Sequence, residues 1–134
     1  MIKLLILDLD GVILDTEKNM IKSWEEVRKK YHIKKKFKDY RKYIGLPFLK
    51  ILKKLKINKN QNKIQRTYKK FSIKNSNNVK LFPKVRETLK KLNKNYILAV
   101  VTSKDCIRTM RFIKKFKLPL KNISCPKKEL RGKP

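Results

Sequence analysis

Three aspartates lie close together near the N-terminus, and the first two have the side-chain type and the spacing that could carry out chemistry. Asp8, Asp10 and Asp15 fall within one short stretch of a 134-residue protein whose formal net charge is +29. An apolar run from Ile2 to Leu7 precedes the first two, and Gly11 follows them. This pattern predicts a buried strand that carries the two carboxylates at its C-terminal end and is followed by a sharp turn.

Two carboxylates at a strand end are suited to phosphoryl transfer. One can attack phosphorus to form an aspartyl-phosphate, and the other can protonate the leaving alkoxide and later deprotonate water. Because two carboxylates and a phosphate repel one another, a hard cation such as Mg²⁺ is expected between them. A hydroxyl and an ammonium group would hold the phosphoryl oxygens. The candidates are Thr102 and Lys133, with Ser103 and Lys104 as nearby alternatives.

The apolar periodicity predicts an α/β sheet interrupted by a helical insertion. We expect a strand at residues 2–9, and then only helices from residue 16 to residue 78. Met20, Trp24, Val27 and Tyr31 form one helical stripe, and we expect Trp24 in the core of the insertion. We expect Asp39 to cap a short helix that ends near Gly45. Pro47 is expected in the first turn of the next helix, and Asn60 is expected to cap the one after it.

After residue 78 the pattern changes. The sequence predicts a helix from Pro83, a strand at Tyr96–Val101 buried on both faces, a helix capped by Asp105 and a short strand at Asn122–Cys125. The predicted domains are therefore an α/β core, residues 1–15 and 79–134, and a helical domain, residues 16–78. In parallel sheets function gathers at the C-terminal strand ends, where Asp8, Asp10 and Thr102 lie.

The positive charge comes mainly from lysine. The chain has 32 Lys and 7 Arg together with 14 Ile and 10 Asn, a bias that an AT-rich genome would produce. Nucleic-acid readers rely more on Arg, so we expect a solvated lysine coat, not a nucleic-acid site. Cys106 and Cys125 are expected to be reduced thiols, and no apolar stretch is long enough for a signal peptide or a membrane span. The predicted location is the cytoplasm.

Three motifs resemble those of the haloacid dehalogenase (HAD) superfamily. The first is DLDGVILDT at Asp8–Thr16, the second VVTSK at Val100–Lys104 and the third GKP at Gly132–Pro134. The segment LFPKVRETLKKL resembles the helix before the second motif, although Lys84 stands where relatives commonly have Gly. The insertion resembles a C1 cap, with YIGLP around Gly45 similar to a substrate-loop segment. The branch it most resembles contains phosphoglycolate phosphatases and β-phosphoglucomutases.

The resemblance implies a role for each site residue and a Rossmannoid core with a C1-type cap. Asp8 would be the nucleophile and a metal ligand, and Asp10 the general acid/base, with its backbone carbonyl on Mg²⁺. Thr102 and Ser103 would bind the phosphoryl group, and Lys133 would neutralise Asp8 and the phosphate. The dehalogenases lack an acid at the position of Asp10, which favours hydrolysis of a small phosphorylated metabolite.

The family's fourth motif, with the acids that complete the Mg²⁺ site, is not found in the sequence. We therefore expect the chain to correspond to the first two thirds of a HAD hydrolase, with the last core strands missing and strand 2–9 at a sheet edge. We also expect it to bind Mg²⁺ weakly and to turn over phosphate esters poorly. The alternatives left open are a phosphomutase, a non-catalytic HAD remnant and a basic nucleic-acid-binding protein. The sequence does not identify the substrate or the oligomeric state.

Overall fold

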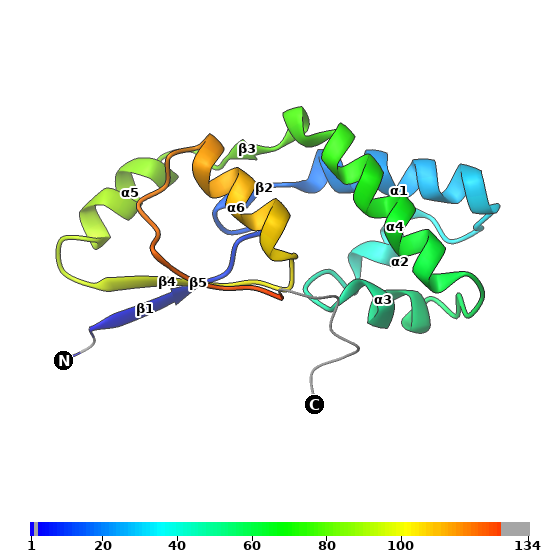
Figure 1. The fold of residues 1–134 in the computed structure, drawn as a ribbon, viewed down its shortest axis with the longest axis horizontal. Coiled ribbons are helices and arrows are strands. Elements are labelled where there is room, and N and C mark those ends of the chain that lie inside the picture. The colour runs from blue at the N-terminus through cyan, green and yellow to red at the C-terminus, as the bar shows by residue number, and fades with distance from the viewer. Residues whose placement is uncertain (2, 127–134) are drawn as a thin grey trace. The chain divides into compact units, whose positions relative to one another are not determined.

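The computed structural model describes residue 1 and residues 3–126, and it divides into two compact units. Of the described residues, those from Met1 to Asp15 and from Lys80 to Pro126 form one unit, and Thr16–Val79 form the other. The first is an α/β unit and the second is helical (Figure 1). Within the described residues, no helix is both long and apolar enough to cross a membrane.

The α/β unit is built on a parallel sheet with the strand order β1-β4-β5. These strands are β1 (Leu4–Leu7), β4 (Ile97–Val101) and β5 (Asn122–Ser124). Leu4 pairs with Ile97 and Leu7 with Val100, so β1 and β4 end at the same edge of the sheet. The predicted α/β fold is therefore confirmed, and β1 is an edge strand of the described sheet.

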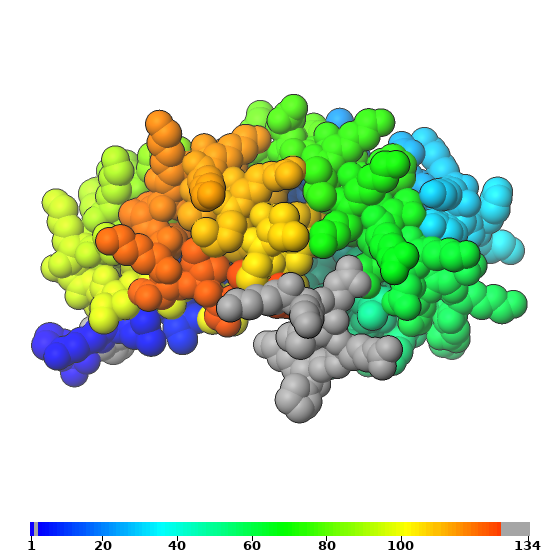
Figure 2. Space-filling model, viewed as in Figure 1, coloured from blue at the N-terminus to red at the C-terminus, as the bar shows by residue number. Residues whose placement is uncertain are grey.

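Two helices, α5 (Val85–Leu92) and α6 (Cys106–Lys115), lie over one face of this sheet (Figure 1). Leu98 and Val100 of β4 are buried on that side. The opposite face is open, because Leu4, Ile6 and Ile97 are 49%, 63% and 57% exposed. Two expectations are thus wrong for the described residues: the strand that precedes Asp8 is not buried, and strand 96–101 is not buried on both faces. Figure 2 shows the β1 side chains (blue) on the surface.

A tight turn and a second, small sheet follow β1. Gly11 has a φ of +78°, a conformation that glycine adopts without steric cost, and its N–H donates to the Leu14 carbonyl at 2.8 Å. The predicted sharp turn is therefore present. Directly after it, β2 (Leu14–Asp15) pairs antiparallel with β3 (Lys80–Leu81), which the sequence did not predict. These two strands join the ends of the helical insertion to the α/β unit.

The helical unit has a closed apolar core. Its α-helices are α1 (Glu17–Tyr31), α2 (Phe37–Arg41), α3 (Phe48–Lys54) and α4 (Gln61–Lys74), followed by the 3₁₀-helix η1 (Ser76–Asn78). Trp24 is completely buried, as expected, and its indole N–H donates to the Lys35 carbonyl at 3.1 Å. The core cluster consists of Trp24, Val27, Phe37, Tyr40, Ile51, Leu52, Leu55, Ile64 and Tyr68.

Buried polar groups fix α1 against α4. The Asn19 side-chain amide donates to the Ser72 carbonyl at 2.9 Å, and the Ser72 hydroxyl donates to Asn19 Oδ1 at 3.1 Å. The hydroxyls of Tyr31 and Thr67 lie 2.8 Å apart. Since each of these groups has a partner from the other helix, their burial fixes the register of the helix pair without leaving a polar group unpaired.

Helix starts follow the sequence in some places and depart from it in others. Asp105 caps α6 as predicted, because its Oδ1 accepts the Arg108 N–H at 3.0 Å. Asp39 lies inside α2, where its Oδ2 accepts the Lys36 N–H, so the expected cap at that residue is wrong. Lys84, at the N-cap of α5, has a φ of +62°, a left-handed conformation that explains why glycine suits this position.

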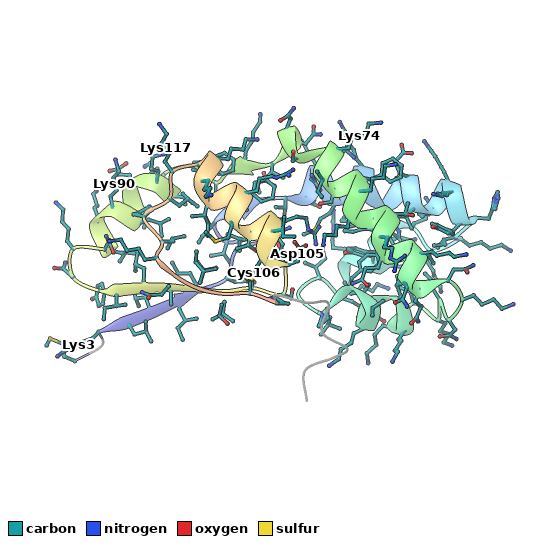
Figure 3. All side chains as sticks on the ribbon, viewed as in Figure 1. Lys3, Lys74, Lys90, Asp105, Cys106 and Lys117 are labelled. Carbon is teal, nitrogen blue, oxygen red and sulfur yellow. A yellow bond between two sulfur atoms is a disulfide. The ribbon has the colours of Figure 1, made fainter. Side chains whose placement is uncertain are left out.

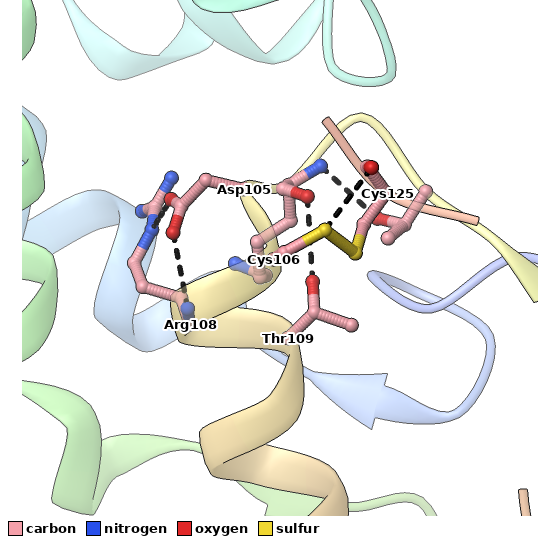
Figure 4. The surroundings of a disulfide bond; sticks show 7 residues. Asp105, Cys106, Arg108, Thr109 and Cys125 are labelled. Carbon is pink, nitrogen blue, oxygen red and sulfur yellow. Dashed lines mark hydrogen bonds and ion pairs between the residues drawn. A yellow bond between two sulfur atoms is a disulfide. The ribbon is translucent and has the colours of Figure 1, made fainter. Parts of the chain in front are cut away.

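The two cysteines are joined, which corrects the expectation of reduced thiols. Cys106 and Cys125 form a disulfide with a Cα–Cα distance of 5.1 Å. The bond links the first residue of α6 to the residue after β5 (Figure 4). Sequence spacing did not indicate it, because the sheet order brings the two residues together.

The lysine coat is seen directly in the structure. Lys3, Lys74, Lys90 and Lys117 are exposed and point away from the ribbon (Figure 3). Lysines of this kind lie in solvent on strands, helices and loops of both units. Lys104 is the buried lysine of the described residues, and it is described with the site below.

Candidate functional site

The ends of β1 and β4 bring the predicted site residues to one edge of the sheet. Asp8 directly follows β1, and Thr102 directly follows β4. Since the strands are parallel and Leu7 pairs with Val100, these two residues leave the sheet on the same side. The predicted arrangement of Asp8 and Thr102 at a common sheet edge is confirmed, whereas their roles stay predictions.

Asp8 and Asp10 have different surroundings. Asp8 is exposed, and its Oδ1 accepts the Leu9 N–H at 2.7 Å. Asp10 is largely buried, with a side-chain exposure of 16%, and its Oδ1 is fully buried without a hydrogen bond. Leu9, between them, is completely buried and forms part of the core. The chain thus presents one carboxylate to solvent and holds the next in the interior.

Lys104 is the cation that faces Asp10. Its Nζ lies 3.3 Å from Asp10 Oδ1, and its side chain is 8% exposed. Burial lowers the pKa of Lys104, while the negative charge of Asp10 opposes that effect. Nζ also lies 5.8 Å from the centre of the Phe112 ring on α6. The sequence indicated Lys104 only as an alternative near the site, and a lysine-rich composition gives no signal that one particular lysine is buried.

Backbone and side-chain hydrogen bonds of Thr102 hold the loop after β4 in place. The Thr102 N–H donates to the Ser124 carbonyl at 3.0 Å, and Thr102 Oγ1 accepts the Lys104 N–H at 3.1 Å. Thr102 is 7% exposed, and Ser103 is exposed. The hydroxyl oxygen of Thr102 therefore acts as an acceptor inside the loop, and this bond does not use the hydroxyl hydrogen.

The α6 side of the loop is fixed as well. The Thr109 hydroxyl donates to the Lys104 carbonyl at 3.3 Å, and the Cys106 N–H donates to the Pro126 carbonyl at 3.1 Å (Figure 4). With the disulfide, these bonds tie the loop, the start of α6 and the end of β5 into one support. The predicted phosphate-side Lys133 lies outside the described residues.

The donor set for a metal is of the type that Mg²⁺ uses. Asp8 offers a carboxylate and Asp10 a backbone carbonyl, and Mg²⁺ is commonly bound by one or two carboxylates with water and phosphate as further ligands. Among the described residues there is no group of three His, Cys, Asp or Glu side chains that could hold a metal ion. The residues therefore fit Mg²⁺ in kind but supply few of its six ligands.

A surface cavity of about 390 Å³ lies elsewhere in the α/β unit. It is lined by Leu81, Phe82, Lys84, Val85, Arg86, Glu87 and Lys90. None of the predicted site residues lines it. It contains no paired carboxylates, so the strand ends remain the stronger candidate for chemistry.

The fold and the aspartates at the strand end define a class of protein. The sequence profile of the haloacid dehalogenase-like hydrolases matches residues 5–134. The chain belongs to this family. The fold class and the resemblance inferred from the three motifs are thereby confirmed.

Solved structures of other proteins share this fold. A hydrolase of the haloacid dehalogenase-like family from Streptococcus pneumoniae superposes with a TM-score of 0.82 at 19% identity, over 93% of this chain and 61% of that one. A predicted phosphatase from Clostridium acetobutylicum gives 0.81 at 20% identity, over 93% and 61%. A predicted phosphoglycolate phosphatase from Haemophilus somnus gives 0.79 at 21% identity, over 98% and 65%. At this identity the likeness shows the fold alone.

The chain spans less than two thirds of the length of these structures. A search of curated proteins found no match. What is established is therefore a hydrolase-family fold with a partial core, in which an exposed and a buried aspartate lie beside the second motif.

Proposed function

We propose that this protein is a phosphatase-type hydrolase that acts on a small phosphate monoester through an aspartyl-phosphate on Asp8, with Mg²⁺ as cofactor. The observation that carries the proposal is the pair of aspartates at the end of β1, beside the end of β4. Two of the proteins with the same fold are described as a predicted phosphatase and a predicted phosphoglycolate phosphatase, which supports the same reaction class.

Each residue has a distinct part in the proposed reaction. The exposed Asp8 carboxylate attacks phosphorus, and the ester oxygen departs with a proton from Asp10. Asp10 then removes a proton from the water that hydrolyses the aspartyl-phosphate. Thr102 and Ser103 donate hydrogen bonds to the phosphoryl oxygens, and Lys133 is proposed to balance their charge.

Mg²⁺, bound by Asp8 and the Asp10 backbone carbonyl, would supply charge neutralisation between the carboxylate and the phosphate. The helical unit is proposed to act as the family's C1-type cap and to contribute to substrate selection. Its YIGLP segment exposes Ile44 and Leu46, at 39% and 37%. Apolar side chains of this kind suit contact with the organic part of a small phosphorylated metabolite.

The cytoplasmic location remains a prediction. One of its supports was the expectation of reduced cysteines, and the disulfide removes that support because such bonds are rare in the cytosol. The exposed lysines of both units fit a solvated coat, and the proposal includes no nucleic-acid partner.

The test is Mg²⁺-dependent phosphate release from an aryl phosphate by the wild-type chain, Asp8→Asn and Asp15→Asn. Asp15 is the matched control, because it is exposed on β2 seven residues further along the chain. We expect Asp8→Asn to abolish turnover, since an amide does not attack phosphorus to form the aspartyl-phosphate, and Asp15→Asn to keep it. Wild-type turnover in Asp8→Asn would contradict the assignment of the nucleophile. Transfer of the phosphoryl group to a sugar phosphate instead of water would show a phosphomutase.

A further inference from the structure

The ion pair between Lys104 and Asp10 is an unusual feature in a protein with so many solvated lysines. Both side chains are largely buried, at 8% and 16% exposure, and Nζ lies 3.3 Å from Oδ1. Withdrawing two charges from water is costly, and a buried pair is often no more stable than apolar residues of the same size. The position of the pair, at the ends of the two strands that carry the site, therefore calls for a functional explanation.

We propose that Lys104 is a positioning residue for Asp10: its ammonium holds Oδ1, so that the other carboxylate oxygen is directed to the proton transfer. The inference rests on the proposed function and adds a residue to it. Asp10 Oδ1 is fully buried and has no hydrogen bond, so the ammonium is its only described partner. Without the cation, the carboxylate would be free to rotate or to leave its buried position.

Lys104 is itself held in place from several directions. Its N–H is bonded to the Thr102 hydroxyl, its carbonyl accepts from Thr109, and its ammonium lies over the Phe112 ring. These contacts come from the loop after β4 and from α6, whereas Asp10 comes from the turn after β1. The pair therefore joins the second motif to the first, and the same loop that offers Thr102 to a phosphoryl group also orients the proton donor.

Three roles of Lys104 predict different ligand affinities. If Lys104 positions Asp10, it affects the contact between Asp10 and the oxygen of the leaving group or of the attacking water. It does not affect the contacts to the phosphoryl oxygens. Orthovanadate can adopt the five-coordinate geometry of the transition state, including an apical oxygen within reach of Asp10, whereas inorganic phosphate is tetrahedral and lacks that geometry. A positioning residue should therefore influence orthovanadate binding more than phosphate binding. A direct phosphate ligand would influence both, and a purely structural residue neither.

The experiment compares the wild-type chain with Lys104→Met, Asp10→Asn and the double variant, using Lys114→Met as the matched control. Lys114 is exposed on α6 in the same unit. Calorimetry measures the affinities for orthovanadate and inorganic phosphate in the presence of Mg²⁺. We expect Lys104→Met to weaken orthovanadate binding by about 10- to 100-fold, in line with the cost of misplacing a reacting group, and phosphate binding by less than about twofold. Lys114→Met should leave both unchanged.

The double variant tests whether Lys104 acts through Asp10. We expect Asp10→Asn with Lys104→Met to bind orthovanadate as Asp10→Asn alone does, because the partner is already lost. Lys104→Met alone leaves the Asp10 carboxylate buried without a partner, which can prevent folding. The double variant has no such unpaired charge, so its comparison with Asp10→Asn can still be made in that case. An equal loss of both affinities, no loss of either, or a further loss in the double variant would overturn the proposal. If the wild-type chain binds orthovanadate no better than Asp8→Asn does, the proposed function itself fails.

Discussion

The helical unit and the α/β unit bury their apolar side chains to very different extents. The helical unit encloses Trp24 and Leu52 completely, and buried hydrogen bonds join α1 to α4. In the α/β unit, one sheet face carries the buried Leu98 and Val100, while Ile6 and Ile97 on the other face are more than half exposed. Parallel sheets normally have both faces covered. The difference teaches that, among the described residues, the helical unit covers its apolar core while the sheet that carries the candidate site leaves one face exposed.

The largest contrast should appear when one apolar side chain is truncated in each unit. Trp24→Ala is expected to lower the free energy of unfolding by about 3–5 kcal/mol, because a large buried aromatic leaves a cavity. Ile97→Thr, on the exposed sheet face, should change it by less than about 0.5 kcal/mol, since more than half of the residue is already in contact with water. Urea unfolding followed by circular dichroism measures both. Similar losses in the two variants would mean that the sheet face is covered in solution.

A smaller effect is expected from the disulfide, which supports the α/β unit alone. Cys106 and Cys125 are 19 residues apart, and closing a loop of this order typically stabilises a protein by about 3 kcal/mol. Replacing both cysteines by serine should lower the free energy of unfolding by that amount. A phosphine reductant should have the same effect on the wild-type protein and none on the variant.

Titration of free thiols in the native protein gives an independent check of the disulfide. We expect no reactive thiol before reduction and two after it. Two free thiols in the non-reduced native protein would contradict the bond and restore the expectation drawn from the sequence.

The smallest expected effect concerns the backbone at the start of α5. Lys84 has a left-handed φ of +62°, a conformation that costs a residue with a side chain roughly 1–2 kcal/mol in the folded state. Glycine avoids this cost, but it loses more conformational entropy on folding, which cancels part of the gain. Lys84→Gly should therefore raise the free energy of unfolding by about 0.5 kcal/mol. Lys90→Gly, in the interior of the same helix, should lower it by about 1 kcal/mol. If both substitutions destabilised the protein equally, the left-handed conformation would be in doubt.

The sequence by itself determined the features that depend on local pattern. The apolar run ending in Asp8 and Asp10 predicted a strand with carboxylates at its tip, and the helical stripe predicted a buried Trp24. The Asp105 cap follows from the same kind of short-range rule, because a side chain bonds a backbone group three residues away. The resemblance also marked Lys84 as a position where relatives commonly have Gly, and the structure supplies the reason, because Lys84 has a positive φ.

Only the tertiary structure decided which distant residues meet. The sheet order β1-β4-β5 brings Cys125 to Cys106, and the pairing of β2 with β3 joins residues more than sixty positions apart. The same order places Lys104 against Asp10. Hydrophobic periodicity reports how a segment faces its immediate surroundings, but it carries no information about which segment provides those surroundings. That is why the burial of Lys104, in a part of the chain where most described lysines are exposed, is visible only in the folded protein.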